Sequence, residues 1–438
     1  MRIVLIAAAL LAADPVLALT SPAPVQAAAQ AERPTPRQTA AAVAARIREL
    51  YFDPAAAERI AADLESAAAA GAFDDLTDGR DLAAELRTRL RPSDAHFSVV
   101  YDPDAPAAPM RRRPPEGAAP QQRPVNPMEA RTHYGFRKAE ILPGNVGYID
   151  LRQFHDIDFS NPADPARRAA DAALDFVSGA DAVIFDLRDN GGGAPSMVGY
   201  LTSAFTPANA PIYNIFHSRQ GTESEAPAVF HRSPRLEVPV YVLTSGRTGS
   251  AGEAFPYTLQ GAGRATIVGE PTGGAANPGG MVPVGGGFAV FISMGSPRNP
   301  ATGTNWEGTG VIPDVAAPWS EALDRAHALA LERIVAADAG RTDAVWALEA
   351  LQADVPGGDL SAYAGTYGEQ TVAVSGDRLS ITRGRRPPVV LSPLGEDLFT
   401  VVGDPSRRYQ FSRDEAGRVT AFDSVGLGLP PVRARRTN

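Results

Sequence analysis

Cysteine is absent from this 438-residue sequence, and Lys138 is its single lysine among 41 basic residues. The lack of cysteine excludes disulfides, thiolate metal sites, cysteine nucleophiles and cysteine-linked lipid anchors. The formal net charge is −9, which argues against nucleic acid as a general partner. Hydrophobic residues make up 44% of the chain and charged residues 21%, a composition typical of a protein that folds around a core.

The first residues have the pattern of a secretory signal peptide. Arg2 precedes the apolar run Ile3–Ala13, which is too short to span a bilayer, and small residues at 25–27 offer a cleavage site. The alternative is a tail rich in alanine and proline. The pattern predicts a signal peptide over residues 1–29, and no later stretch is long and apolar enough to cross a membrane. We therefore expect a periplasmic or secreted protein with no integral membrane segment after signal removal.

Residues 35–92 have the spacing of a small helical domain, because apolar side chains recur every three or four positions in three stripes. The stripes are Val43, Ile47 and Leu50; Ile60 and Leu64; and Leu82, Leu86 and Leu90. Residues 93–134 are expected to be a strand followed by a linker rich in proline and arginine. In that strand, His96, Ser98 and Val100 would share one face.

Residues 135–340 alternate between strand-like and helix-like segments, which indicates an α/β fold with much parallel pairing. The expected strands are 145–151, 182–187, 238–244, 265–268 and 288–293, and the expected helices are 165–177, 197–204, 253–260 and 320–337. Residues 358–438 instead contain short β-like runs with turn residues between them, which predicts a small antiparallel β domain. These runs are 370–374, 378–382, 389–391, 398–402, 409–412 and 419–422.

Ser250 lies where the strand at 238–244 gives way to the helix at 253–260, in the sequence Thr-Gly-Ser-Ala-Gly. A strand–turn–helix junction exposes a side chain at the end of a strand and directs backbone N–H groups toward developing negative charge. The alternative is an ordinary glycine-rich turn in which the serine only caps the helix. The junction is not the Gly-x-Ser-x-Gly elbow of α/β-hydrolases.

Two further motifs flank this junction in the chain. A strand runs into a glycine turn at Ile184–Gly193, and a Trp-Glu-Gly loop lies within Asn305–Asp314, with Gly263–Glu270 between Ser250 and that loop. In this order the motifs resemble peptidase family S41, the C-terminal processing or tail-specific proteases. The resemblance covers roughly Thr39–Asp314.

Within that family the chain is most similar to the branch of the tricorn protease core and interphotoreceptor retinoid-binding protein, through Asp94-Ala95-His96 and Gly144–Tyr148. The resemblance implies a crotonase-like ββα superhelix core, to which the C-terminal β domain does not belong. Many members carry a PDZ domain, but the interval between His96 and Gly144 is too short for one. Those members also pair their serine with a downstream lysine, whereas Glu270–Ala276 contains none, so a Ser/Lys dyad does not fit.

The resemblance implies a role for each matching residue. Ser250 would be the nucleophile, His96 its general base, and Glu307 the carboxylate that orients the imidazole. Backbone N–H groups of Ala251 and of Gly191 or Gly192 would form the oxyanion hole. The alternatives are a hydrogen-bonded histidine at a strand start, a solvated loop glutamate and a phosphate-binding glycine loop, although the Walker and dinucleotide spacings are absent.

The tricorn branch has a serine directly before its histidine, where this chain has Ala95, and Ser98 is the possible substitute. The implied activity is that of an exported serine peptidase which cleaves peptides or unfolded protein tails through an acyl-enzyme, without metal or cofactor. Two alternatives remain open: a non-proteolytic protein that binds ligands or peptides on the same scaffold, and an esterase-like hydrolase with the same triad.

Overall fold

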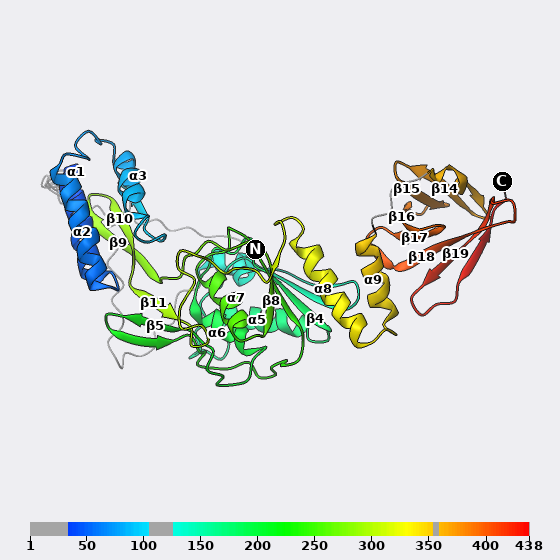
Figure 1. The fold of residues 1–438 in the computed structure, drawn as a ribbon, viewed down its shortest axis with the longest axis horizontal. Helices are drawn as coiled ribbons and strands as arrows, with labels where there is room; N and C mark the ends of the chain where they lie inside the picture. The colour runs from blue at the N-terminus through cyan, green and yellow to red at the C-terminus, as the bar shows by residue number, and fades with distance from the viewer. Residues whose placement is uncertain (1–33, 105–125, 354–358, 438) are drawn as a thin grey trace, which may run out of the picture.

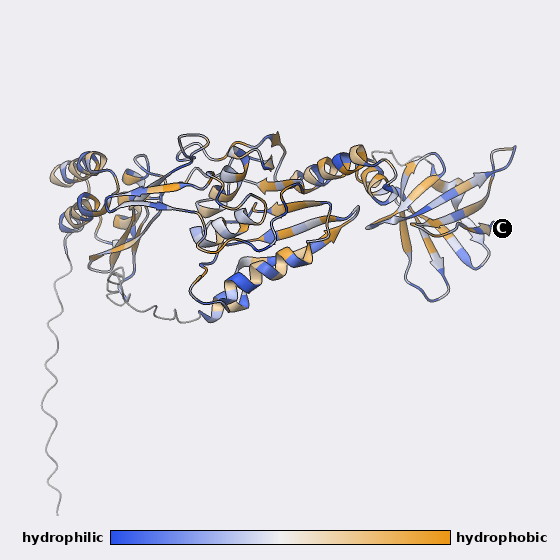
Figure 2. Cartoon of the chain, turned by 90° about the horizontal axis from the view of Figure 1, so that it is seen from below, coloured by the Kyte–Doolittle hydropathy of each residue, from blue (hydrophilic) through white to orange (hydrophobic). Residues whose placement is uncertain are grey.

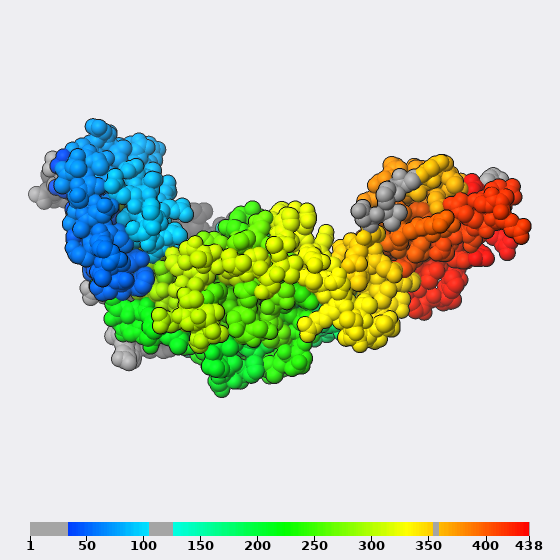
Figure 3. Space-filling view, viewed as in Figure 1, coloured from blue at the N-terminus to red at the C-terminus, as the bar shows by residue number. Residues whose placement is uncertain are grey.

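The computed structural model describes residues 34–104, 126–353 and 359–437, which form three lobes in a row (Figure 1). The expected signal peptide and most of the expected linker lie outside these residues. No helix among the described residues is long and apolar enough to cross a membrane. In the space-filling view the N-terminal and C-terminal lobes stand at opposite ends of the central one (Figure 3).

The N-terminal lobe contains the predicted helices, packed on a three-stranded antiparallel sheet of order β1–β10–β9. Thr35 begins the first helix with a reciprocal capping box, and Asp53 and Asp78 cap the next two. The elements are α1 (Pro36–Leu50), α2 (Pro54–Ala69), α3 (Gly79–Leu90), β1 (Val99–Tyr101), β9 (Gly279–Gly285) and β10 (Phe288–Ser293). Two strands of this lobe thus come from a segment far along the chain.

His96 does not lie on a strand, contrary to the expectation that His96, Ser98 and Val100 share one strand face. The strand begins only at Val99, and His96 sits in the preceding turn, in which the Phe97 N–H donates to the Asp94 carbonyl at 3.1 Å. The turn forms because the Asp94 side chain accepts the His96 backbone N–H at 2.8 Å, a local bond that competes with strand pairing.

The central lobe is built on a six-stranded sheet of order β12–β8–β7–β4–β3–β2. All neighbouring pairs are parallel except β2 and β3, which pair antiparallel at one edge. The strands are β2 (Phe136–Leu142), β3 (Val146–Leu151), β4 (Ala182–Asp186), β7 (Val240–Thr244), β8 (Ala265–Gly269) and β12 (Val315–Ala316). The expected α/β class is confirmed.

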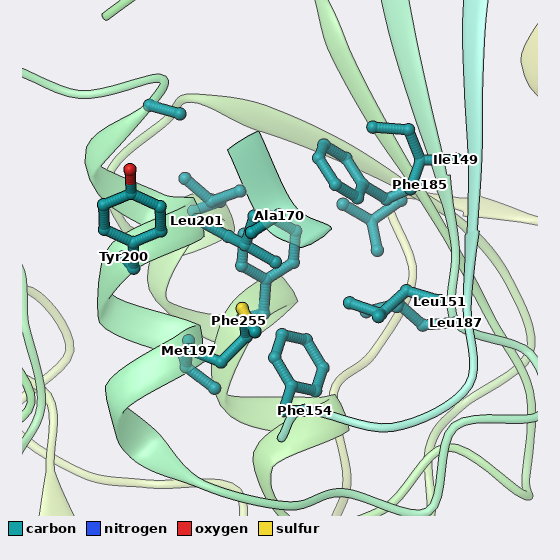
Figure 4. Packing of buried hydrophobic residues seen from close by; sticks show 14 of the residues in the cluster. Ile149, Leu151, Phe154, Ala170, Phe185, Leu187, Met197, Tyr200, Leu201 and Phe255 are labelled. Carbon is teal, nitrogen blue, oxygen red and sulfur yellow. The ribbon is translucent and has the colours of Figure 1, made fainter. Parts of the chain in front are cut away.

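Helices cover both faces of this sheet, which is why the strands β3, β4 and β7 are buried along their whole length. One face packs against α5 (Pro165–Phe176), α6 (Pro195–Ser203) and α7 (Ala251–Gly261), with Phe154, Phe185 and Phe255 in contact at its centre (Figure 4). The other face packs against α8 (Ala322–Ala337) and α9 (Thr342–Gln352). Many residues of the central strands are hydrophobic, whereas the helices carry both hydrophobic and hydrophilic residues (Figure 2).

Smaller elements complete the central lobe. A sheet of order β11–β5–β6 lies between the N-terminal lobe and the main sheet in Figure 1. The remaining elements are α4 (Pro127–Arg131), η1 (His133–Gly135), β5 (Ile215–Ser218), β6 (Gly221–Ser224) and β11 (Gly295–Arg298).

The C-terminal lobe is the predicted antiparallel β domain, with each strand paired to the next along the chain. A bridge between Tyr367 and Arg436 joins the first strand to the end of the last, so the eight-stranded sheet closes on itself. Aromatic side chains fill its interior. The elements are η2 (Leu360–Tyr363), β13 (Gly365–Tyr367), β14 (Gln370–Ser375), β15 (Arg378–Arg383), β16 (Val389–Gly395), β17 (Leu398–Val401), β18 (Asp404–Arg413), β19 (Val419–Gly426) and β20 (Val432–Arg435).

Candidate active site

Ser250 sits at the N-terminus of α7, at the end of the loop that leaves β7. Its backbone angles are φ 53° and ψ −122°, a left-handed conformation that a residue with a Cβ rarely adopts. Such a conformation costs about 1–3 kcal/mol and persists only where the surroundings enforce it. Backbone strain of this kind is concentrated at functional sites, and it distinguishes Ser250 from an ordinary capping serine.

Glu253 helps to hold the Ser250 backbone in this conformation, although the sequence analysis gave Glu253 no role. Its side chain is fully buried, and Oε2 accepts the Ser250 backbone N–H at 2.8 Å and the Ala275 N–H at 2.9 Å. Oε1 accepts the Gly274 N–H at 2.7 Å and the Thr272 hydroxyl at 2.5 Å. The available signal was its place three residues after a helix-capping serine.

The turn after β4 packs directly against Ser250. Gly192 has φ +118°, and a Cβ added there would lie 2.7 Å from the Ser250 Cβ, so only glycine fits. The Asn190 carbonyl accepts the Gly249 N–H at 3.0 Å, which ties the two turns together. Asn190 Oδ1 accepts the Gly192 N–H at 2.8 Å, whereas the described residues provide no acceptor for the N–H of Gly191.

The imidazole of His96 faces two carboxylates from different parts of the chain. Its Nδ1 lies 3.4 Å from Asp94 Oδ1 and 3.8 Å from Glu307 Oε2, and its ring stacks on Phe291 at 5.7 Å between centroids. Both ring nitrogens are buried, and neither has a hydrogen-bond partner among the described residues. The structure thus brings His96 and Glu307 together, as predicted, and adds Asp94.

Glu307 is held in place by backbone donors. Its Oε2 accepts the N–H groups of Ala276 at 2.7 Å and Asn277 at 3.1 Å, and the buried indole of Trp306 beside it donates to the Ala275 carbonyl at 3.3 Å. Burial raises the pKa of Glu307 above its ordinary value, and the negative charge of Asp94 raises it further. The backbone donors lower the pKa but do not cancel these two effects. Glu307 is therefore not the solvated loop glutamate of the alternative interpretation.

Asp94 is the second residue to which sequence reasoning gave no role, although the Asp94-Ala95-His96 motif contained it. It is almost completely buried, and Oδ2 accepts the Tyr51 hydroxyl at 3.2 Å. Burial alone would raise the pKa of Asp94, but its contacts with the His96 side chain and backbone outweigh burial and hold the pKa below its ordinary value. Asp94 is therefore an ionised neighbour of the imidazole.

Consecutive residues of one loop link the serine to the histidine. Ala275 is bonded to Glu253, which holds Ser250, and Ala276 is bonded to Glu307, which faces His96. Because the His96 nitrogens have no hydrogen-bond partner among the described residues, the Ser250 hydroxyl is not bonded to the ring here. Ser98 makes no hydrogen bond to the ring either.

The rival candidates for nucleophile and base have other partners. The Ser245 hydroxyl is buried and donates to the Arg188 carbonyl at 2.5 Å. Lys138 lies half-exposed on β2 and pairs with Glu140. Neither contacts the cluster formed by Asp94, His96 and Glu307. Among the described residues, that cluster is also the one whose donor atoms lie close enough for a shared metal ion, within 4.8 Å of one another.

Comparison with known proteins finds a family model that matches part of the chain. Residues 145–317 match the model of peptidase family S41. The chain is 26% identical over 208 residues to a chloroplast carboxyl-terminal-processing peptidase 1 of Arabidopsis thaliana, covering 47% of this chain and 40% of the relative. It is 28% identical over 173 residues to a carboxyl-terminal-processing protease of Synechocystis, covering 39% and 38%. The chain thus spans about two fifths of the length of these relatives.

A solved structure of a lipoprotein from Streptococcus agalactiae is also similar, with 13% identity and a TM-score of 0.43, covering 68% of this chain and 97% of that one. The tricorn protease structure is similar at 17% identity and a TM-score of 0.28, covering 42% and 16%.

Proposed function

We propose that the protein is a serine peptidase that uses Ser250, His96 and Glu307, since residues 145–317 match the model of peptidase family S41. The observation that carries this proposal is the strained backbone of Ser250 at a helix N-terminus, locked by Gly192 and Glu253. A capping serine would not need a left-handed conformation enforced from two sides.

In the proposed reaction, the Ser250 hydroxyl attacks a peptide carbonyl while His96 takes its proton through Nε2. That nitrogen is buried and without a hydrogen-bond partner, so it is chemically free to accept a proton. The imidazolium that forms faces the carboxylates of Asp94 and Glu307 across Nδ1, which stabilise its charge. The same proton then goes to the leaving amine, and water hydrolyses the acyl-enzyme by the reverse steps.

The oxyanion that develops on the substrate needs two free backbone donors close to Ser250. Ala251 follows the nucleophile and begins α7, and the described residues provide no acceptor for its N–H. Gly191 is the partner we propose, because the Gly192 N–H is occupied by Asn190. The positive end of the α7 dipole adds to the stabilisation.

A fluorophosphonate probe tests this assignment, because it reacts only with an activated serine. We expect the wild-type protein to be labelled and to cleave a peptide, while Ser250→Ala abolishes labelling and lowers turnover by roughly 10⁴–10⁶-fold with the fold retained. Ser245→Ala is the matched control and should still be labelled. Loss of labelling in Ser245→Ala but not in Ser250→Ala would show that Ser245 is the nucleophile and that the assignment to Ser250 is wrong. A folded wild-type protein that binds peptides without labelling or turnover would favour the binding-protein alternative.

We propose further that the protein is exported and that its substrates are peptides or unfolded protein tails. The support is the signal pattern in residues 1–29 and the names of the relatives, which are carboxyl-terminal-processing proteases. Sequencing of the N-terminus of the native protein should return a start near Ala28. A native protein that still begins at Met1 would contradict export by this signal.

A further inference from the structure

The Asp94–His96–Glu307 cluster has a geometry that a triad alone does not explain. In a hydrogen-bonded triad a carboxylate oxygen lies about 2.6–3.2 Å from the imidazole nitrogen. Here the two distances from His96 Nδ1 are 3.4 Å and 3.8 Å, and Nδ1 is buried without a hydrogen bond. Two carboxylates therefore share one nitrogen, and neither is bonded to it.

These separations suit a metal ion placed between the three side chains. With zinc bonds of about 2.0–2.2 Å to nitrogen and oxygen and tetrahedral angles, ligand atoms lie about 3.4 Å apart. All three donor atoms lie within 4.8 Å of one another, so a small adjustment would bring them around one ion. Imidazole nitrogen and carboxylate oxygen are both zinc ligands in proteins.

Outer hydrogen bonds hold the carboxylates as they do in metal centres, where ligands are oriented by further donors. Asp94 accepts the His96 N–H and the Tyr51 hydroxyl, and Glu307 accepts the N–H groups of Ala276 and Asn277. Asn277 is itself buried, and its side-chain oxygen has no hydrogen-bond partner among the described residues. The cluster is thus preformed and electronegative, and the two ring nitrogens of His96 have no hydrogen-bond partner among the described residues.

We propose that Asp94, His96 and Glu307 bind a zinc ion, and that the ion reversibly inhibits the peptidase. Zinc on Nδ1 would place a dication beside the ring, which opposes the protonation of Nε2 that the base must undergo. It would also neutralise the carboxylates that stabilise the imidazolium. The binding claim stands on the geometry alone, whereas the inhibition claim rests on the proposed function.

Zinc binding can be measured directly on the full-length protein after treatment with a chelator. Titration with zinc chloride against a chromophoric chelator should give one site in the wild type. His96→Gln and Glu307→Gln should each weaken zinc binding by at least about tenfold. His217→Gln is the matched control, because His217 is an exposed histidine on β5, and it should bind zinc as the wild type does. Magnesium chloride should not compete, since magnesium disfavours imidazole ligands.

Cobalt chloride gives a second readout that does not depend on activity. Cobalt in the same site should produce visible absorption bands of a four-coordinate ion, and Glu307→Gln should remove them while circular dichroism shows a retained fold. Equal zinc binding by wild type and His96→Gln, or no binding by a folded wild type, would overturn the site.

Inhibition is tested separately by adding zinc to the labelling reaction at Ser250. We expect zinc to slow fluorophosphonate labelling and a chelator to restore it. Zinc that binds at one site without slowing the labelling would overturn the inhibitory role and leave the site standing. A protein that binds zinc and is never labelled would instead overturn the proposed peptidase.

Discussion

His96 and Lys138 are the two candidate bases for Ser250, and their surroundings differ sharply. The His96 ring is buried against two carboxylates, whereas Lys138 is half-exposed and already paired with Glu140. A lysine base would need a strongly depressed pKa, which burial away from carboxylates produces and a salt bridge does not. The surroundings therefore favour His96.

We expect His96→Ala to lower kcat/KM by roughly 10⁴–10⁶-fold, because a triad acts as a unit and the base is lost. Lys138→Ala should retain near-normal turnover on the same peptide. Glu307→Gln should fall between them, with a loss of roughly 10²–10⁴-fold, since the base remains but loses a charged partner. Steady-state kinetics on variants with wild-type circular dichroism decide this. Loss of activity in a folded Lys138→Ala variant would instead support a Ser/Lys dyad.

Glu225 is a buried carboxyl that the proposed reaction does not use, and it makes stability depend on pH. Its Oε2 accepts the Asn214 amide at 2.7 Å, but Oε1 is buried with no hydrogen-bond partner among the described residues. Burial raises the pKa of Glu225 to about 8 from 4.5. The folded state therefore binds a proton that the unfolded state releases between these two values.

Since the folded pKa is raised, the stabilising contribution is complete below pH 4.5 and is lost as the pH rises to about 8. Glu225→Gln keeps the hydrogen bond to Asn214 and removes the titration. The Tm difference between variant and wild type should thus grow in favour of the variant from pH 5 to pH 8. Thermal melts at several pH values measure it. A difference that stays constant with pH would show that Glu225 does not titrate in this range.

At the scale of elements, the site depends on two turns that interlock at the ends of neighbouring strands. β4 and β7 pair in parallel, so their carboxyl ends meet at one edge of the sheet, and the turns that follow carry Gly192 and Ser250. Gly192 accepts no Cβ because the Ser250 Cβ and the Gly249 carbonyl occupy the space. The position of Ser250, the proposed nucleophile, is therefore set by a glycine in the turn that follows another strand.

Gly192→Ala should leave the lobe folded and lower kcat/KM by at least about 100-fold, since a shift of about 1 Å at a catalytic group has that effect. The reasons are the contact with Ser250 and a φ of +118°, which alanine tolerates poorly. Gly246→Ala is the matched control, because Gly246 lies exposed in the same loop as Ser250 with nothing within 4 Å. Equal activity of the two variants would contradict the interlocked arrangement.

Periodicity predicted the longer helices and the strands at the centre of the main sheet, but it missed β2 and did not give the partners of every strand. The strand at 288–293 was predicted as part of an alternating α/β series, yet β10 pairs with β1 and packs under the N-terminal helices. The alternation of buried and partly exposed residues along this strand would fit either the main sheet or the sheet of the N-terminal lobe, so the sequence alone could not identify its partners. The strands β13 and β20 were missed because they are short, and they gain their pairing from closure of the sheet.

The candidate site was predicted from motifs and only partly from physical pattern. Ser250, His96 and Glu307 came from the order of three motifs, and the structure brings His96 and Glu307 together. Asp94 and Glu253 were given no role because acidic side chains usually face solvent, and only the tertiary fold buries these two. The strain at Ser250 likewise depends on Gly192, a contact between distant segments.

At the scale of the whole molecule, the proposed base and the proposed nucleophile belong to different lobes. His96 lies in the N-terminal lobe, which β9 and β10 complete, while Ser250 lies on the central sheet. Glu307 bridges them, because it is anchored to the loop before β9 and faces His96. The chain supplies His96 to the N-terminal lobe and then Ser250 to the central lobe, and it returns to the N-terminal lobe through the hairpin of β9 and β10 before it reaches Glu307. The order of the proposed triad along the chain follows from this path.

The C-terminal lobe contributes none of these residues and has a core of its own. It joins the central lobe through Arg408, whose guanidinium lies 4.4 Å from the Trp346 ring centroid and pairs with Glu349 on α9. The candidate site draws its residues from Asp94 to Glu307, and their hydrogen bonds and ion pairs among the described residues do not reach the β domain. The chemistry should therefore survive its removal.

A chain ending after Gln352 should retain fluorophosphonate labelling at Ser250 and near-normal turnover of a short peptide. Its Tm should fall modestly, because removal of Arg408 uncovers Trp346. The full-length Arg408→Ala variant is the matched control, since it breaks the same contact and keeps the lobe. If the shortened chain folds and labels normally but cleaves long unfolded proteins poorly while the Arg408→Ala variant does not, the β domain positions substrate. Loss of labelling in a folded shortened chain would instead contradict the independence of the site from that lobe.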